Sequence, residues 1–223
     1  MRKLLILAVL LTGCSPRAEK SATANVGMTE DEFMLVIGID MSGSFSHRMA
    51  DGGDGHRFMM TLIDNYFRSR IGSQDKILIL QLSANDDVLL YEGTPMDLRR
   101  KFPTPREFAA FLNKHADANG SLLQRGLNRA LKYVLSDYRV KSGHSKVGMF
   151  VLSDMEDTEN DAGVLEELTD RLAKLKDAGG ILGMYYLSID ECEAWRRKMG
   201  EIGFANSRVE STIMDKPVLP NFD

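Results

Sequence analysis

The amino-acid sequence predicts an α/β fold with a doubly wound, mostly parallel six-stranded sheet and helices on both of its faces. Short apolar runs recur along the chain, and segments whose apolar side chains follow helical spacing lie between most of them. Strands that alternate with helices favour right-handed crossovers and a parallel sheet. The apolar runs are unbroken rather than alternating with polar residues, which is typical of strands that are buried on both faces.

Residues 1–13 have the pattern of a signal peptide, with two basic residues followed by an apolar core. The apolar core is too short for a permanent membrane helix, which needs about 20 residues. Residues 11–14 read Leu-Thr-Gly-Cys and resemble the lipobox of bacterial lipoproteins. That resemblance implies cleavage before Cys14 and acylation of Cys14 with more than one chain, which anchors a protein stably. The alternative is an ordinary secretory signal with an incidental cysteine.

The same resemblance implies a location in the bacterial cell envelope. Ser15 follows Cys14, where Asp is associated with retention in the inner membrane, so the outer membrane is favoured if the organism is Gram-negative. Residues 14–30 are polar and rich in Ala and Ser, and predict a flexible tether to a folded domain of residues 31–223. A chain of this length can bury a full core.

The charge of the chain bears on its partners, and its cysteine content bears on disulfide formation. The formal net charge of −4 gives no broad basic field, which argues against nucleic acid as a partner. Cys192 is the only cysteine after Cys14, so we predict no disulfide within the mature chain and assign Cys192 no role.

The predicted strands and helices follow one another along the domain. Apolar runs predict strands at residues 34–39, 76–82, 88–91, 146–153, 181–189 and 211–214. Helical spacing predicts helices over residues 56–71, from residue 104 onward, and over residues 121–138, 165–175 and 191–202. Thr104, Pro105 and Glu107 form a capping box with Pro at the first helical position. The basic run at residues 98–101 is interpreted as a solvated face.

Polar residues follow the first predicted strand, at the end where open α/β sheets bind their ligands. Asp40, Ser42 and Ser44 occupy alternate positions, with Gly43 allowing a tight backbone. One carboxylate and two hydroxyls at this spacing suit a hard divalent cation, above all Mg²⁺. The alternative is a turn that Asp and Ser side chains stabilise.

Two further segments complete a family resemblance. Residues 119–121, Asn-Gly-Ser, precede a predicted helix, and residues 151–154, Val-Leu-Ser-Asp, end a predicted strand. Together with the Asp-x-Ser-x-Ser motif, they resemble the metal-ion-dependent adhesion site (MIDAS) of von Willebrand factor A domains, over about residues 33–214. Two residues depart from the family pattern: Ser121 stands where Thr is usual, and Met155 where Gly is usual. Ser121 could also be a simple helix N-cap.

The resemblance implies a function in binding. The implied metal ligands are Asp40, Ser42, Ser44, Ser121 and Asp154. The implied cation is Mg²⁺, with Mn²⁺ or Ca²⁺ as alternatives. A protein partner that presents an Asp or Glu carboxylate is expected to complete the metal shell. The resemblance thus implies an envelope-anchored binding protein for adhesion, scaffolding or assembly, and not an enzyme.

Two other functions remain open at this stage. A metal-dependent hydrolase of phosphoester or peptide substrates could use His47 as a general base, although no nucleophile with an adjacent base is evident. A metal-free structural domain is the other alternative. A loop at residues 51–54, Asp-Gly-Gly-Asp, could hold a second cation, but Asp and Gly more often build turns. Histidines 47, 56, 115 and 144 are scattered, and surface or loop positions are expected for them.

Overall fold

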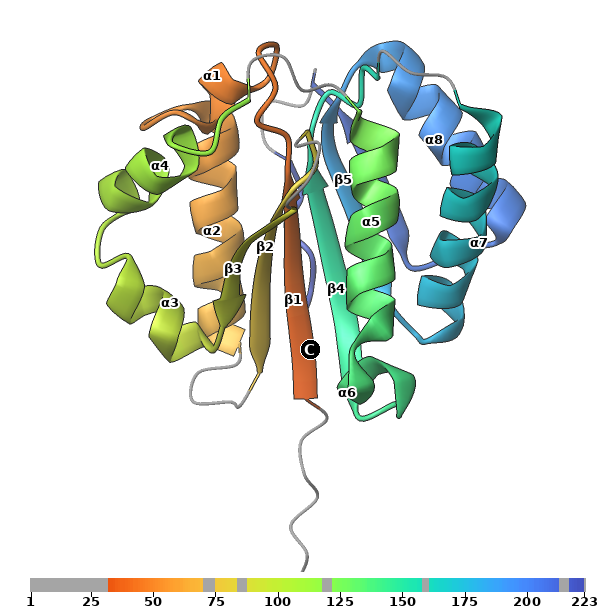
Figure 1. Ribbon diagram of the computed structural model, residues 1–223, viewed down its shortest axis with the longest axis horizontal. Helices are drawn as coiled ribbons and strands as arrows, with labels where there is room; N and C mark the ends of the chain where they lie inside the picture. The colour runs from red at the N-terminus through yellow and green to blue at the C-terminus, as the bar shows by residue number, and fades with distance from the viewer. Residues whose placement is uncertain are drawn as a thin grey trace, which may run out of the picture. The chain divides into compact units, whose positions relative to one another are not determined.

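A single mixed sheet forms the centre of the domain (Figure 1). The structure is a computed structural model, and it describes residues 32–69, 75–83, 88–117, 122–157, 161–212 and 217–222. The predicted signal peptide, Cys14 and the tether lie outside the described residues. The strands are β1 (Glu32–Ile39), β2 (Lys76–Gln81), β3 (Leu89–Gly93), β4 (Ser145–Leu152), β5 (Ile181–Leu187) and β6 (Ser207–Ser211).

The strand order is β3-β2-β1-β4-β5-β6. All neighbouring pairs are parallel except the edge pair of β2 and β3, which is antiparallel. The short connection from β2 to β3 accounts for this exception, because parallel neighbours need a long crossover. The predicted α/β class with a mostly parallel six-stranded sheet is therefore confirmed for the described residues, with one antiparallel pair at its edge.

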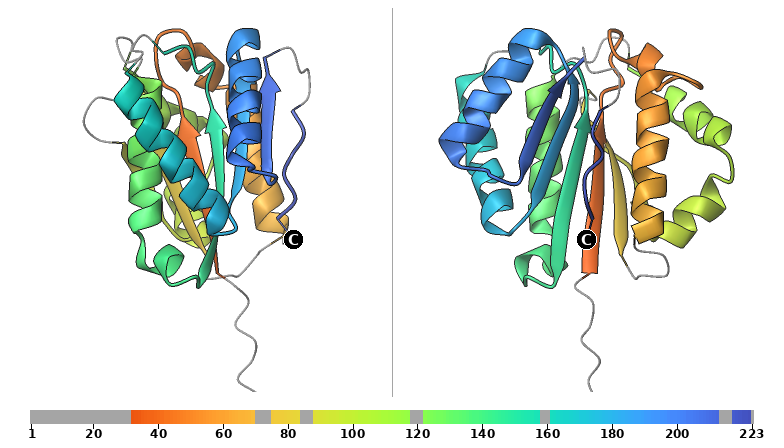
Figure 2. Two further views of the ribbon diagram at one scale, coloured as in Figure 1. Left: turned by 90° about the vertical axis from the view of Figure 1, so that its right-hand side faces the viewer. Right: turned by 180° about the vertical axis from the view of Figure 1, so that it is seen from behind.

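Helices cover both faces of the sheet (Figures 1 and 2). Among the described residues, none of the helices is long and apolar enough to cross a membrane. The helices are α1 (Ser46–Met49), α2 (Asp54–Ser69), α3 (Pro95–Lys101), α4 (Pro105–Asn113), α5 (Leu123–Ser136), α6 (Tyr138–Lys141), α7 (Ala162–Asp177) and α8 (Ile189–Ile202).

Alternate side chains of β1 enter two separate cores. Met34 and Val36 pack in a core that also contains the buried faces of α5, α7 and α8. Leu35 and Ile37 pack in the other core, with the buried faces of α2 and α4. A strand between two helical layers needs apolar residues at every position, which explains the unbroken apolar run.

The C-terminal tail completes the second core. Residues 217–222 run over the sheet face beside α2 (Figure 2). The Phe222 side chain is buried, and its ring lies 5.3 Å from the Tyr66 ring and 5.7 Å from the Phe150 ring, centroid to centroid. Asn65 of α2 donates a hydrogen bond to the Pro220 carbonyl oxygen (3.1 Å), so α2 also holds the tail by a polar contact.

Local sequence signals set several element ends. The predicted capping box is present: the Thr104 hydroxyl accepts a hydrogen bond from the Glu107 amide, and the Glu107 carboxylate accepts one from the Thr104 amide, both at 3.2 Å. Thr94 and Asp97 form an equivalent box at the start of α3, which was not predicted. Gly179, at φ 71°, follows the end of α7, where a left-handed glycine commonly terminates a helix.

Two strand predictions need correction. The last strand was predicted at residues 211–214, but β6 covers Ser207–Ser211. Gly203, at φ 68°, ends α8, and the next residue, Phe204, is already buried. The chain therefore rejoins the sheet earlier than the apolar pattern suggested. The fifth strand was predicted to reach residue 189, but Ile189 is the first residue of α8.

Candidate metal centre

Asp40 anchors the candidate site at the carboxyl end of β1. Its side chain is fully buried, and its backbone amide donates to the Leu152 carbonyl oxygen of β4 at 2.9 Å. The Ser42 amide donates to Oδ1 of Asp40 (2.8 Å) and the Ser153 hydroxyl donates to Oδ2 (2.9 Å). Both carboxylate oxygens are therefore fixed by hydrogen bonds.

Burial raises the pKa of the Asp40 carboxyl above its ordinary value, and the negative charge of Asp154 acts in the same direction. Hydrogen bonds from Ser42 and Ser153 oppose this rise by favouring the ionised form. A buried carboxylate with a second carboxylate nearby is an environment that a bound cation would stabilise.

A row of hydrogen bonds joins the end of β1 to the end of β4. The Ser42 and Ser44 hydroxyl oxygens lie 3.2 Å apart, and the Ser44 hydroxyl donates to Oδ2 of Asp154 at 2.9 Å. Ser42 is buried, Asp154 is half-buried and Ser44 is exposed, so the row runs from the interior to the surface. Four of the five predicted ligand residues thus lie together, as the adjacency of β1 and β4 requires.

The fifth predicted ligand, Ser121, lies outside the described residues. The described residues on either side of it contact the two ligand-bearing loops. The Asp117 amide donates to the Met41 carbonyl oxygen at 3.1 Å. The Gln124 amide, in the first turn of α5, donates to the Asp157 carboxylate at 2.7 Å.

Two serines that hold the site were not predicted as site residues. Ser153 donates to Asp40 and accepts a hydrogen bond from the Met155 amide at 2.8 Å. Ser83 accepts a hydrogen bond from the Met41 amide at 3.0 Å. Both side chains are fully buried, and both follow the last residue of a central strand closely. A hydroxyl just beyond a central strand is the signal that could have identified them.

Met155 has an unusual backbone for a residue with a side chain. Its φ is 58°, in the left-handed region, and its side chain is fully buried in the core beneath α5 and α7. Left-handed backbone is uncommon outside glycine and is found preferentially at functional sites. The chain therefore has a glycine-like turn at the position where the family resemblance places Gly.

The oxygens brought together at this site fit a hard divalent cation. Two carboxylates and the hydroxyls of Ser42 and Ser44 meet without a nitrogen or sulfur ligand in the row, which suits Mg²⁺, Mn²⁺ or Ca²⁺ more than zinc. Within the described residues, no group of three or more His, Cys, Asp or Glu side chains could hold a metal. A cation here would therefore depend on hydroxyl as well as carboxylate oxygens.

Acidic side chains lie on one side of the site, and α1 lies on the other. On the side of β4, burial raises the pKa of Glu191, and the charges of Asp157, Glu156 and Asp190 raise it further. On the side of β1, α1 follows directly after Ser44 and carries His47 and Arg48. Figure 1 shows α1 and α8 on opposite sides of the loops that end β1 and β4.

The loop at residues 51–54 forms a turn. Gly52 has φ 78°, and Asp54 begins α2. The Asp54 carboxylate accepts a hydrogen bond from the Gly55 amide at 3.0 Å and pairs with Arg48 at 2.9 Å. These contacts match the turn interpretation of this loop.

The histidines and Cys192 differ in their exposure. His47 is exposed on α1. His56 is 2% exposed, which corrects the expectation of a surface or loop position, and burial lowers its pKa. Cys192 is a buried free cysteine, and burial raises its pKa.

Comparison with known proteins assigns no family to the chain. No protein-family model matches the sequence, and no curated protein matches it. Among solved structures, proximal thread matrix protein 1 from the mussel byssus is similar, with a TM-score of 0.48 and 11% sequence identity. The similarity covers 82% of this chain and 45% of that protein, so this chain spans less than half of that protein's length. A likeness this weak carries no argument about function.

Proposed function

We propose that residues 31–223 form a von Willebrand factor A domain that binds a protein partner through a Mg²⁺-dependent MIDAS site. The proposed ligands are Asp40, Ser42, Ser44, Ser121 and Asp154. The observation that carries the proposal is the hydrogen-bonded row from Ser42 through Ser44 to Asp154, which joins two adjacent parallel strands at their carboxyl ends. Open α/β sheets bind their ligands at this edge.

The chain's own residues give the site its preorganisation. Ser42 and Ser153 fix the buried carboxylate of Asp40, so this ligand loses little freedom when a cation binds. Ser44 and Asp154 lie on the solvent side of the row, where a partner can reach. When bound, Mg²⁺ supplies a positive charge that can take a partner carboxylate oxygen as a ligand.

The flanking charges suggest how a partner approaches. The acidic side chains of Glu156, Asp190 and Glu191 disfavour an incoming carboxylate from the side of β4. On the side of α1, the charge of Arg48 is balanced by its ion pair with Asp54 at 2.9 Å. We infer that the partner presents basic residues toward this acidic side.

The proposal places this domain on a lipid anchor in the bacterial cell envelope, with the outer membrane favoured for a Gram-negative organism. It rests on the lipobox resemblance of residues 11–14 and on the polar segment at residues 14–30. A tether of this length would let the domain reach partners near the membrane surface. Nucleic acid is not among the proposed partners.

The hydrolase alternative has less support at this site. The site hydroxyls contact carboxylates or one another: Ser42 contacts Ser44, Ser44 contacts Asp154, and Ser153 contacts Asp40. An activated serine would instead be hydrogen-bonded to a base such as histidine. Turnover of generic phosphoester or peptide substrates would favour the hydrolase over the binding function.

A pull-down from detergent-solubilised envelopes tests the proposal, with the full chain as bait and with either Mg²⁺ or a chelator present. We expect a partner that is retained with Mg²⁺ and released by chelator. Ser121→Thr should keep the partner, whereas Ser121→Ala should weaken binding by about 1–3 kcal/mol because a polar ligand is lost. Asp170→Asn, which removes an exposed carboxylate on α7, is the matched control and should bind as wild type does. Chelator-resistant binding would show that the partner docks elsewhere.

A further inference from the structure

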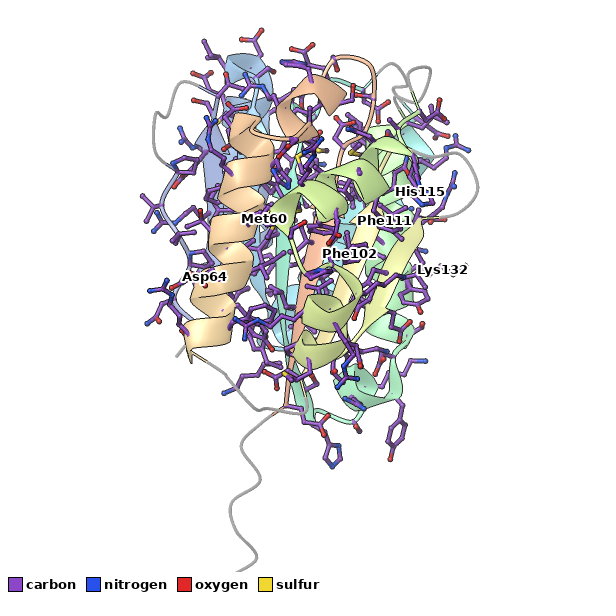
Figure 3. All side chains as sticks on the ribbon, turned by 90° about the vertical axis from the view of Figure 1, so that its left-hand side faces the viewer. Met60, Asp64, Phe102, Phe111, His115 and Lys132 are labelled. Atoms are coloured by element: carbon purple, nitrogen blue, oxygen red, sulfur yellow. The ribbon has the colours of Figure 1, made fainter. Side chains whose placement is uncertain are left out.

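A cavity separates α2 from α3 and α4, apart from the row of site oxygens. Its volume is about 330 Å³, within the range of small-molecule sites in proteins. Figure 3 shows Met60 and Asp64 on α2 and Phe102 on the connection between α3 and α4. Most of the lining is apolar, and it includes Met60, Ile63, Phe67, Leu98, Phe102 and Phe108.

The connection between α3 and α4 forms one wall of this cavity. Pro103 and Pro105 both line the cavity, and the proline ring restricts the backbone at each position. Thr104 lies between them and is held in the capping box with Glu107. The two prolines and the cap restrict the backbone of this connection where it lines the cavity.

One cation at the cavity has no carboxylate partner among the residues that the structure describes. The Arg99 guanidinium lines the cavity and lies 5.0 Å from the centroid of the Phe67 ring, which also lines it. Among the described residues, no Asp or Glu forms an ion pair with Arg99. The carboxylate that lines the same cavity, that of Asp64, is already paired with Arg68 at 2.8 Å.

We propose that this cavity binds a small amphipathic carboxylate, with its hydrocarbon chain among the apolar side chains and its carboxylate at Arg99. An apolar cavity with one placed polar group is the usual design of a small-molecule site. A guanidinium can bind a carboxylate through two parallel hydrogen bonds. The basic run at residues 98–101 contributes to recognition through Arg99, and the site is independent of the proposed metal centre.

Photolabelling of the full chain tests this site. The probe is an octanoate analogue that carries a diazirine on its chain, and the comparison probe is the matching alcohol. Labelled peptides are located by mass spectrometry. In wild type we expect label on peptides from α2 and from the α3–α4 region. The alcohol should label up to about fivefold less, because one exposed ion pair contributes up to about 1 kcal/mol.

Three variants separate this site from non-specific uptake of the probe. Arg99→Glu should lower labelling by the carboxylate by up to about fivefold. Met60→Trp should fill the cavity and remove the label, and a thermal melt verifies that this variant is folded. Arg197→Glu, an exposed charge change on α8, is the matched control and should label as wild type does. No label in this region of wild type, equal labelling by both probes, or equal labelling of Arg99→Glu and wild type would overturn the proposal.

Discussion

Substitution of Met155 changes the stability of the fold through two opposing effects. Its side chain is fully buried while its backbone φ is 58°. Met155→Gly would relieve the strain of the left-handed backbone, which would stabilise the fold by about 1–2 kcal/mol. It would also remove a buried Met side chain, which costs about 2–5 kcal/mol. Because the lost packing outweighs the relieved backbone, we expect the free energy of unfolding to fall by about 2 kcal/mol.

Met155→Ala separates the two effects. It loses nearly the same packing but keeps the cost of the left-handed backbone, so it should be about 1 kcal/mol less stable than Met155→Gly. This is the reverse of the usual order, in which Ala is the more stable residue in regular structure. The assay is urea unfolding of the full chain followed by circular dichroism. A glycine variant as stable as wild type, or an alanine variant more stable than the glycine variant, would contradict this ranking.

Two further predictions concern acid stability and anchoring. Burial acts to raise the pKa values of Glu92 and Asp137, but hydrogen bonds from Lys76 outweigh it and hold both below their usual values. A carboxyl whose pKa is lower in the folded state stabilises the protein above its unfolded pKa, and this stabilisation is lost as the pH falls through the folded pKa. The free energy of unfolding, measured by urea titration, should therefore fall below about pH 4.5, and Lys76→Met should make that fall smaller. An unchanged pH dependence in Lys76→Met would count against this. Cys14→Ser should abolish metabolic labelling by a palmitate analogue, and equal labelling of both proteins would rule out the lipobox interpretation.

Much of the fold could be predicted because the sheet is buried on both faces. Burial on both sides forces unbroken apolar runs such as that of β1, and these are visible in the sequence. Short elements were missed, namely α1, α3 and α6, because a helix of one or two turns has too few residues to show a period. The position of β6 was missed because its start depends on the turn at Gly203 and on the burial of Phe204.

The candidate site was predicted only in part, and the reason lies in tertiary contacts. Asp40, Ser42 and Ser44 form a local motif. Asp154 was added by the family resemblance, and it lies beside them because β4 pairs with β1. The supporting roles of Ser83 and Ser153 depend on which backbone amides and carboxylates face them. Such contacts leave no periodic pattern in the sequence.

The proposed function requires that the oxygens at the ends of β1 and β4 form one divalent-cation site. Calorimetric titration of the full chain with Mg²⁺ and Mn²⁺ measures this directly, in wild type, Asp40→Asn, Asp154→Asn and the control Asp170→Asn. These substitutions keep the shape of the side chain and remove one charge each. We predict saturable binding in wild type and Asp170→Asn, no measurable binding in Asp40→Asn and weakened binding in Asp154→Asn. Equal affinity in all four proteins, or no binding in wild type, would mean that the motif is only a turn.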